Sequence, residues 1–371
     1  MSSSVAIVIL NWNGVSFLER FIPILYNNTP KEIGEIIIAD NGSTDSSVEW
    51  LKENYPMLRL ILLDKNYGFT GGYNRALAQI EAKYFILLNS DIRVPIASYL
   101  SADNSTVDNS TADNSIVDNS TANTTDWLTP LYNFMEQNPK AGICQPKILS
   151  EQNPTYFEYA GAAGGFIDRY GFPFCRGRIL SCLEEDKGQY NTPIQTFWAS
   201  GACMMVRNSI WRELNGLDDL FFAHMEEIDF CWRAQLKGYE VWCVPQSSVY
   251  HVGGGTLPND SPRKLLLNFR NNLLMLHKNL PVGFSKKWAI FRRMSIDGAA
   301  AVAFLLQGKF KFFMVVINAH REFGAMRKKY PAATFPSPTA PKPKGLYNGG
   351  VVLGFFLGRR RFVSLKKEEI S

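Results

Sequence analysis

Asn89-Ser90-Asp91 directly follows the apolar run 84–88, which is typical of a buried strand. A carboxylate at the end of a strand suits a hard divalent cation, because such cations prefer oxygen ligands. A cation there could neutralise the charge of a diphosphate leaving group. Asp is also an ordinary turn or cap residue after a strand, so this motif alone leaves metal binding and a structural turn open.

Glu226-Glu227-Ile228-Asp229 places three carboxylates within four residues at the start of a predicted helix. Negative charge complements the positive N-terminal end of a helix, which is a purely structural explanation. Glu226 and Glu227 are sequential and point about 100° apart on a helix, so one of them should face inward. Neighbouring like charges raise the pKa of at least one carboxyl, and a raised pKa is what a general base needs. Both interpretations stay open at this level.

His251 is the one histidine of four that follows a short predicted strand and precedes a glycine turn, Gly253–Gly255. A lone histidine is usually structural, but beside a carboxylate such as Asp91 it becomes a candidate metal ligand. The glycine run fits neither the Walker nor the dinucleotide-binding spacing. The first strand is followed by N-W-N-G rather than by a Rossmann fingerprint, which counts against an NAD enzyme.

The elements that must position these residues alternate in type along the chain. Apolar runs at 5–10, 35–39, 58–63 and 84–88 predict strands, and helical patterns lie near 15–26, 45–54 and 70–80. This alternation predicts an α/β fold with βαβ units and a largely parallel sheet. Ligands of such sheets bind beyond the carboxyl ends of the strands, so the loops after the four runs should carry the chemistry.

Further elements are predicted downstream, after an unusual segment. Between residues 102 and 124 the chain repeats units such as A-D-N-S-T with a period of five, which fits neither helix nor strand. We interpret residues 96–125 as a low-complexity, disordered insertion, an expanded surface loop or alternatively a segment that closes over a ligand. Beyond it the patterns predict a helix at 126–137, strands at 141–148 and 241–244, a glycine-rich hairpin at 156–174, and a helix at 226–237. Residues 197–206 form an apolar segment with a central glycine.

Composition excludes several classes of protein. The 371 residues are 46% apolar and 20% charged, which excludes a wholly disordered chain and a collagen-like fibre. Six cysteines include no C-x-x-C pair, so a zinc knuckle or a thioredoxin-type site is not expected. The first apolar run is too short for a secretory signal, and no uncharged stretch near the C-terminus reaches the roughly 20 residues that span a bilayer. These features predict reduced thiols and a cytoplasmic location.

Charge is distributed unevenly. Residues 1–261 carry 18 Lys and Arg against 30 Asp and Glu, whereas residues 262–371 carry 21 against 4. A basic segment interleaved with aromatic residues indicates an anionic partner, and its pattern resembles interfacial amphipathic helices. We favour a membrane surface over ordinary helical packing, and expect no nucleic acid. The expected organisation is a domain at 1–261, a helical, membrane-associating region at 262–330, and a Pro-rich linker with a basic tail at 331–371.

The ordered blocks V-A-I-V-I-L-N-W-N-G, I-I-I-A-D-N-G-S-T-D, N-Y-G-F-T-G-G-Y-N-R-A-L and F-I-L-L-N-S-D resemble glycosyltransferase family 2. The later blocks F-W-A-S-G-A-C-M-M-V-R, F-F-A-H-M-E-E-I-D-F-C-W-R and Y-H-V-G-G-G-T continue the resemblance, which covers residues 4–256. It implies the GT-A fold, a mixed and mostly parallel sheet flanked by helices. The chain is most similar to the bacterial rhamnosyltransferase-like branch.

The resemblance also implies residue roles. Asp40 would bind a pyrimidine base, and Asp91 with His251 would hold Mn²⁺ or Mg²⁺. Glu227 would be the catalytic base, with Glu226 and Asp229 as alternatives. Arg233 would orient Asp229 or contact the diphosphate. The remaining residues implied in binding the nucleotide sugar are Asn11, Asn13, Asn66, Gly68, Asn74, Ser90, Gly201 and Ala202.

The implied activity is an inverting transfer of a sugar from a UDP- or dTDP-sugar to a hydroxyl of a glycan, with dTDP-rhamnose as one candidate donor. The acceptor would be a lipid-linked, polyprenyl-diphosphate glycan in cell-surface polysaccharide biosynthesis, and the enzyme would be peripheral on the inner face of the membrane. One alternative is a nucleotidyltransferase, but the N-W-N-G-V-S loop lacks the triphosphate-binding pattern that it would need. The other alternative is a non-catalytic nucleotide-sugar-binding relative.

Overall fold

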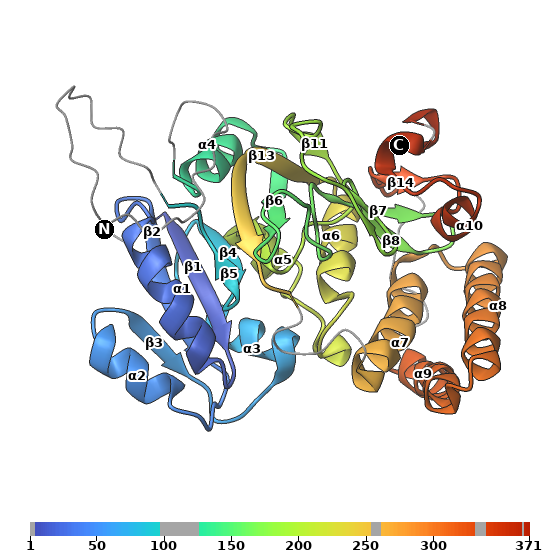
Figure 1. Ribbon diagram of the computed structural model, residues 1–371, viewed down its shortest axis with the longest axis horizontal. Coiled ribbons are helices and arrows are strands. Elements are labelled where there is room, and N and C mark those ends of the chain that lie inside the picture. Colours follow the sequence, from blue (N-terminus) through green and yellow to red (C-terminus); the bar gives the residue numbers. More distant parts are fainter. Residues whose placement is uncertain (1–3, 97–125, 254–260, 331–338, 366) are drawn as a thin grey trace.

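The computed structural model describes residues 4–96, 126–253, 261–330, 339–365 and 367–371. The five-residue repeats fall within 97–125 and so lie outside the described residues, as do residues 254–260 beyond the glycine turn and 331–338 of the predicted linker. The predicted α/β architecture is confirmed: a nine-stranded mixed sheet lies at the centre of the molecule, with helices packed around it (Figure 1).

The N-terminal part of this sheet is parallel, as the alternation of strands and helices predicts. Strand β1 (Val5–Asn11) pairs in parallel with β2 (Gly34–Asp40) and with β4 (Tyr84–Asn89), and β3 (Arg59–Leu62) continues the sheet beyond β2. The strands are nearly continuous apolar runs because helices α1 (Val15–Asn27), α2 (Ser47–Asn54) and α3 (Gly68–Leu77) cover them. The registers place Asn11 opposite Asp40, so the polar strand ends meet at one sheet edge.

The rest of the central sheet brings in distant segments. Its complete order is β11-β13-β6-β12-β4-β1-β2-β3, with β5 (Ile92–Arg93) pairing with β13. The strand predicted at 241–244 is the start of a longer one, β13 (Glu240–His251), with a register shift between Cys243 and Ser248. The remaining elements of this part are α4 (Thr129–Gln137), β6 (Ala141–Ser150), β11 (Ile194–Gln195), β12 (Cys203–Arg207), α5 (Asn208–Glu213), the 3-10 turn η1 (Asp219–Phe221) and α6 (Glu226–Leu236).

A second sheet of five strands has the order β10-β9-β8-β7-β14. Four of its strands come from one segment of the chain: β7 (Gly165–Asp168), β8 (Pro173–Cys175), β9 (Arg178–Ile179) and β10 (Cys182–Leu183). The fifth, β14 (Leu346–Tyr347), comes from the segment whose sequence predicts a tail, and it pairs in parallel with β7. Phe362 packs there against Phe166, Phe174 and Tyr190, so this segment is part of the core.

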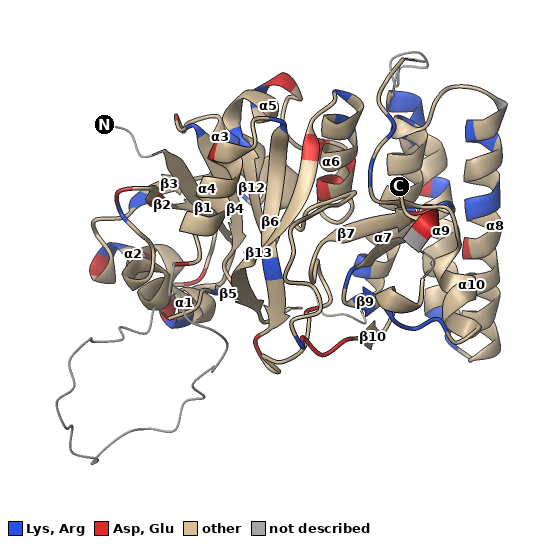
Figure 2. Cartoon of the chain, turned by 90° about the horizontal axis from the view of Figure 1, so that it is seen from above, with Lys and Arg blue, Asp and Glu red and all other residues tan. Residues whose placement is uncertain are grey.

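Three long helices form the predicted helical region: α7 (Pro262–Asn279), α8 (Phe284–Leu306) and α9 (Phe310–Met326). They group at the opposite end of the molecule from α2 and β3 (Figure 1), and they carry many Lys and Arg residues (Figure 2). On α8, the buried ion pair of Arg293 with Asp297 is 2.9 Å long, and Arg293 also donates to the carbonyl of Gly171 in the second sheet region. The chain continues through the 3-10 turn η2 (Arg327–Lys329), then α10 (Val351–Phe356) and the short turns η3 (Phe362–Ser364) and η4 (Lys367–Glu369).

The packing of Phe362 gives a stability prediction. Its ring is 8% exposed and lies among aromatic side chains from residues nearly 200 positions earlier in the chain. We expect Phe362→Ala to lower the free energy of unfolding by about 3 kcal/mol, because it leaves a cavity in the second sheet. Urea unfolding would measure this. The adjacent Val363 is 56% exposed, so Val363→Ala should change stability by less than about 0.5 kcal/mol. Equal effects of the two variants would contradict the packing role.

Candidate active site

Four polar side chains at the ends of β1 and β2 form one connected cluster. The amide of Asn11 donates to Asp40 Oδ2 at 3.0 Å and to Ser43 Oγ at 3.2 Å, and Asp40 Oδ1 accepts from the backbone N–H of Ser43. Asn13 has a left-handed backbone, with φ of 49°, and its side-chain oxygen accepts from Thr44 N–H at 2.7 Å. Asn11 Oδ1 is buried and has no hydrogen-bond partner among the described residues. The sheet edge therefore holds a preformed polar cradle with spare acceptor capacity.

A second group of side chains fixes the loop that enters α3. Asn41, which sequence reasoning missed, donates to Asn66 Oδ1 and to the carbonyl of Gly68, and it accepts from Tyr67 N–H. Gly68 has φ of 71°, and a Cβ atom there would lie 2.5 Å from the ring of Phe222. Asn66 Oδ1 also accepts from the backbone N–H of Gly68 at 2.7 Å, at the start of α3. Gly68 permits a close approach of two loops.

Asp91, His251 and Glu158 form a buried row of alternating charge. His251 Nε2 lies 3.1 Å from Asp91 Oδ1, and its Nδ1 lies 3.2 Å from Glu158 Oε2. Burial alone would lower the pKa of His251, but Asp91 and then Glu158 outweigh it and raise that pKa to about 10. Burial likewise opposes ionisation of Asp91, yet the charge and hydrogen bond of His251 lower its pKa. Without a metal ion, the imidazolium therefore supplies the positive charge at this site.

The oxygen and nitrogen atoms of this row could supply some, but not all, of the ligands of a divalent cation. A carboxylate oxygen and an imidazole nitrogen already face each other, and Glu158 is placed to accept the Nδ1–H of a neutral His251, which leaves Nε2 for a metal. Across the described ranges no three His, Cys, Asp or Glu side chains converge on a single point. Asp91 faces Nε2 of His251 and Glu158 faces Nδ1, on the other side of the imidazole ring. The protein therefore offers a metal ion two ligands, Asp91 and His251, and the remaining coordination positions would be filled by bound ligands.

The first two carboxylates of α6, on the buried Glu226 and the half-buried Glu227, form no ion pair in the described chain. Glu226 is 4% exposed, and one carboxylate oxygen of each of Glu226 and Glu227 is buried without a hydrogen-bond partner in the described chain. Burial, and then the charge of Glu227, raises the pKa of Glu226 well above its ordinary value. Burial raises the pKa of Glu227 to about 7. Glu227 also lies next to the backbone of Gly201, where an added Cβ would be 3.8 Å from its own Cβ.

The loop before α6 is strained. Phe222 has φ of 65° and ψ of −56°, and Ala223 N–H donates to the carbonyl of Phe221 at 2.8 Å, which together define a γ-turn of the rare, strained hand. His224 and Met225 follow with φ of 69° and 72°. Such conformations cost about 1–3 kcal/mol each and persist only where the surroundings enforce them.

Asn271 of α7 holds this loop in place. Its side-chain amide donates to three backbone carbonyls, at 2.9 Å to Phe221, 2.8 Å to Ala223 and 2.8 Å to His224. From the other side, the backbone N–H groups of Phe69 and Thr70 in α3 donate to the carbonyl of Phe222. The strained loop is therefore held between α3 and α7, the first helix of the C-terminal region.

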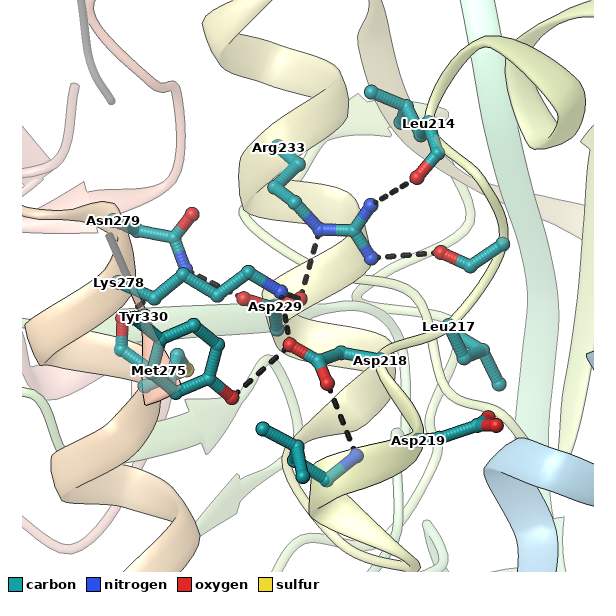
Figure 3. A network of polar contacts seen from close by, with 12 residues as sticks. Leu214, Leu217, Asp218, Asp219, Asp229, Arg233, Met275, Lys278, Asn279 and Tyr330 are labelled. Atoms are coloured by element: carbon teal, nitrogen blue, oxygen red, sulfur yellow. Dashed lines mark hydrogen bonds and ion pairs between the residues drawn. The ribbon is translucent and has the colours of Figure 1, made fainter. Parts of the chain in front are cut away.

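Asp229 is the centre of a charged network rather than an exposed acid (Figure 3). Its carboxylate is 0% exposed and accepts from Lys278 Nζ, Arg233 Nε and Asn279 Nδ2 at 2.7–2.8 Å. Burial alone would raise the pKa of Asp229, but Lys278 and Arg233 lower it. The remaining donors of Arg233 bind the carbonyls of Leu214 and Gly216. Both Asp229 and Arg233 are fully engaged with the protein.

The other implied binding residues fall into two groups. Ser90 lies beside the Asn11 cradle, because a Cβ on Gly14 would be 3.6 Å from Ser90 Oγ and 2.5 Å from Asn11 Oδ1. The carbonyl of Ala202 accepts from Asn89 N–H and so joins β12 to the end of β4. Asn74, in contrast, is turned to the protein: it exchanges hydrogen bonds with the backbone of Leu217 and donates to Asp219.

Sequence reasoning missed Asn271, Lys278, Asn279 and Glu158. A signal was present for the first three: they are polar residues on the buried face of a leucine-rich helix, where an unpartnered amide or ammonium is costly. Glu158 has no such signal, since it lies in a loop whose place beside His251 depends on the pairing of β6 with β13.

Comparisons with known proteins agree with this geometry. Residues 4–100 match the family model described as Glycosyl transferase family 2, and residues 115–264 match that described as Glycosyl transferase family group 2. One similar protein is the N-acetylglucosaminyl-diphospho-decaprenol L-rhamnosyltransferase of Mycobacterium tuberculosis, 22% identical over 74% of this chain and 85% of the relative. Another is the low-salt glycan biosynthesis hexosyltransferase Agl10 of Haloferax volcanii, 21% identical over 88% and 91%.

Solved structures show the same fold. S. aureus TarS residues 1–349 match with a TM-score of 0.52 and 12% identity over 87% of this chain and 80% of that chain. GalNAc-T7 with UDP, GalNAc and Mn²⁺ matches with a TM-score of 0.52 and 15% identity over 75% of this chain, which spans about half of that protein. The fold and the family matches together define a glycosyltransferase of the GT-A type. The chain belongs to glycosyltransferase family 2, as its motifs indicate.

The clamp on the strained loop can be tested by Asn271→Leu. This change leaves three loop carbonyls without their donor, so we expect the free energy of unfolding to fall by about 3 kcal/mol. We also expect amide hydrogen exchange at residues 222–225 to accelerate. Asn268→Leu, at a half-buried position one turn earlier on α7, is the matched control and should change neither quantity much. Wild-type exchange in the Asn271 variant would refute the clamp.

Proposed function

We propose that this enzyme transfers a sugar, with inversion, from a UDP- or dTDP-sugar to a hydroxyl of a glycan acceptor. The observation that carries the proposal is the half-buried Glu227 beside the backbone of Gly201, whose pKa is raised by burial to about 7. The name of the M. tuberculosis relative supports a lipid-linked acceptor, a polyprenyl-diphosphate glycan in cell-surface polysaccharide biosynthesis, and dTDP-rhamnose as one candidate donor.

Glu227 is assigned as the base on electrostatic grounds. Asp229 has a lowered pKa and its oxygens are taken by Lys278, Arg233 and Asn279, so it serves to position α6. Burial and the charge of Glu227 raise the pKa of Glu226 well above its ordinary value, which disfavours its carboxylate form. Burial raises the pKa of Glu227 to about 7, where a general base is most efficient.

The reaction then has a defined course. The Glu227 carboxylate takes the proton of the acceptor hydroxyl as its oxygen bonds to the anomeric carbon of the donor. The bond from that carbon to the diphosphate oxygen breaks on the opposite face of the sugar, which inverts the anomeric configuration. The nucleoside diphosphate leaves with the electron pair. Asp40 and Asn11, with Asn13 beside them, bind the pyrimidine through free acceptor positions of the cradle.

Asp91 and His251 would hold a divalent cation, Mn²⁺ or Mg²⁺, when the donor binds. Such a cation supplies positive charge to the leaving diphosphate. His251 must lose its proton to act as a ligand, and Glu158 then accepts its remaining N–H and fixes the ring. The Mn²⁺ named with the GalNAc-T7 structure is consistent with this assignment.

The C-terminal helices support a peripheral association with the inner face of the cell membrane. Their outer faces expose large apolar side chains beside basic ones, a pattern of interfacial helices. The exposed apolar residues are Trp288, Phe291, Val302, Leu305, Leu306, Phe310, Met314 and Ile317 on α8 and α9, with Leu353 and Phe356 on α10. None of the helices in the described ranges is long and apolar enough to cross a membrane.

The base assignment predicts unequal effects of two neighbouring substitutions. Glu227→Gln should reduce kcat about 10²–10⁴-fold and leave donor binding intact, because the amide cannot accept the proton. Glu226→Gln, the matched control, should lose far less, since the raised pKa of Glu226 disfavours the carboxylate form that a base needs. For the wild type, kcat/KM for the acceptor should rise with pH through about 7 as Glu227 ionises.

Glu227→Gln should lower kcat but should not lower the stability of the folded protein at alkaline pH. Since burial raises the folded-state pKa of Glu227 to about 7, its contribution to stability is lost as the pH rises through that value. Glu227→Gln should therefore be at least as stable as the wild type at pH 8, as measured by urea unfolding. A larger loss of kcat in the Glu226 variant would move the base to Glu226, and full activity of both variants would exclude both residues as the base. Donor binding without turnover in the wild type would identify a non-catalytic binder.

The donor and metal assignments predict the outcome of a panel of UDP- and dTDP-sugars. One donor should release its nucleotide in the presence of Mn²⁺ or Mg²⁺ but not of EDTA. Asp91→Asn should weaken Mn²⁺ binding, measured by calorimetry, at least about tenfold by removing a ligand. Glu53→Gln, which removes a surface carboxylate on α2, is the control. Failure of every pyrimidine nucleotide to bind would refute the roles of Asp40 and Asp91.

A further inference from the structure

A cavity of about 630 Å³ lies between α6, α7, α8 and the turn η2, on the far side of Asp229 from the strained loop. Its wall includes Lys278 and Asn279, which also hold the buried Asp229 carboxylate. None of the residues assigned to base, ribose or metal binding lines this cavity. Arg233, which the resemblance places near Asp229 or the diphosphate, does line it. A volume of this size is typical of a small-molecule site.

The charge of this cavity is strongly positive. Lys286, Lys287 and Arg327 line it and form no ion pair with any residue that the structure describes. The one acidic residue of the lining, Asp218, is already bound to Lys278 Nζ at 2.8 Å and to the hydroxyl of Tyr330 at 3.0 Å. Burial, and then Lys286 and Arg327, lower the pKa of the lining residue His277, as an uncompensated positive field would.

The opposite side of the cavity is apolar. Ile290, Phe291 and Met294 line it along α8, and Val282 lines it at the turn before that helix. Phe291 is 60% exposed and stacks on Trp288, with ring centroids 5.6 Å apart, and Val282 is 64% exposed. The apolar lining therefore continues onto the exposed apolar face of α8 without a polar boundary at these residues.

We propose that this cavity binds an amphiphile that carries a phosphate or diphosphate head and a hydrocarbon chain. The head would contact Lys286, Lys287 and Arg327, and the chain would run along Phe291 and Val282 onto the outer face of α8. A purely ionic ligand leaves the apolar side unused, and a neutral lipid leaves three cations unpaired. Two sources share this chemistry: the carrier of a lipid-linked acceptor, and an anionic phospholipid of the membrane.

The inference deepens the proposed function, and its role in catalysis rests on that function. Lys278 contacts both the cavity and Asp229, which lies two residues after Glu227 on α6. An occupied cavity would thus be connected, through one side chain, to the helix that carries the base. The binding itself does not depend on this role and can be measured without a donor or a reaction.

The test uses the full chain in EDTA without nucleotide, and farnesyl diphosphate as a soluble probe, with binding followed by calorimetry. In the pocket variant, Lys286, Lys287 and Arg327 are all changed to Gln. In the control variant, Lys309, Lys311 and Arg321 of the same helical region, which do not line the cavity, are changed to Gln. Both variants lose three positive charges. We expect the pocket variant to bind the probe at least tenfold more weakly and the control to stay within twofold of the wild type.

Comparison probes test the amphiphilic character of the site. Farnesol and inorganic pyrophosphate should each bind at least tenfold more weakly than farnesyl diphosphate. Equal losses in the two variants, or pyrophosphate binding as tightly as farnesyl diphosphate, would overturn the proposal. Donor-dependent nucleotide release should be retained by the pocket variant, so failure of the transferase assignment and failure of the cavity assignment give different results.

Vesicles distinguish the two sources of the ligand. If phosphatidylglycerol vesicles displace the probe and phosphatidylcholine vesicles do not, the cavity takes a membrane phospholipid. If neither displaces the probe, the cavity is selective for the prenyl chain and fits a lipid-linked acceptor. Both results support the amphiphile site. Retention of full probe binding by the pocket variant would refute it.

Discussion

The Asp229 carboxylate has no contact with solvent, and a charge buried in this way is tolerated only when it is paired. Its partners come from two helices, Arg233 on α6 itself and Lys278 with Asn279 on α7. This requirement fixes α7 against α6 and so fixes the C-terminal helices relative to the catalytic sheet. The C-terminal helices are therefore packed directly against the candidate active site through Lys278 and Asn279.

The region around the Asp229 network contains several energetically unfavourable features of the backbone and side chains. Phe222, His224 and Met225 have left-handed backbones, and Glu226 and Glu227 are buried acids with unpaired oxygens. Together these features lie between two rigid clamps, α3 and Asn271. Strain held by its surroundings in this way is typical of sites that must present one side chain in a fixed position.

Much of the fold could be predicted from the sequence. Buried strands such as β1 and β4 are continuous apolar runs, and the polar residues after them necessarily meet at one sheet edge, as Asn11 and Asp40 do. The sequence alone could not tell the structural role of Asp229 and Arg233 from the role proposed for Glu227. Helix periodicity does not reveal which of the acids at the start of α6 pairs with Lys278. The place of β14 could not be predicted either, since two residues beside prolines carry no strand signal and pair only through long-range contacts.

That late strand has a consequence for biosynthesis of the protein. Val351 N–H binds Asp168 across 183 positions, and Phe362 N–H binds Glu184 across 178. A chain emerging from the ribosome presents β7 to β10 long before β14 exists, so their shared aromatic core stays open to water until translation has passed Phe362. A chain whose synthesis stopped early would carry an intact N-terminal part of the central sheet beside an incomplete second sheet. Cellular proteases and chaperones can recognise the exposed surface of such a chain.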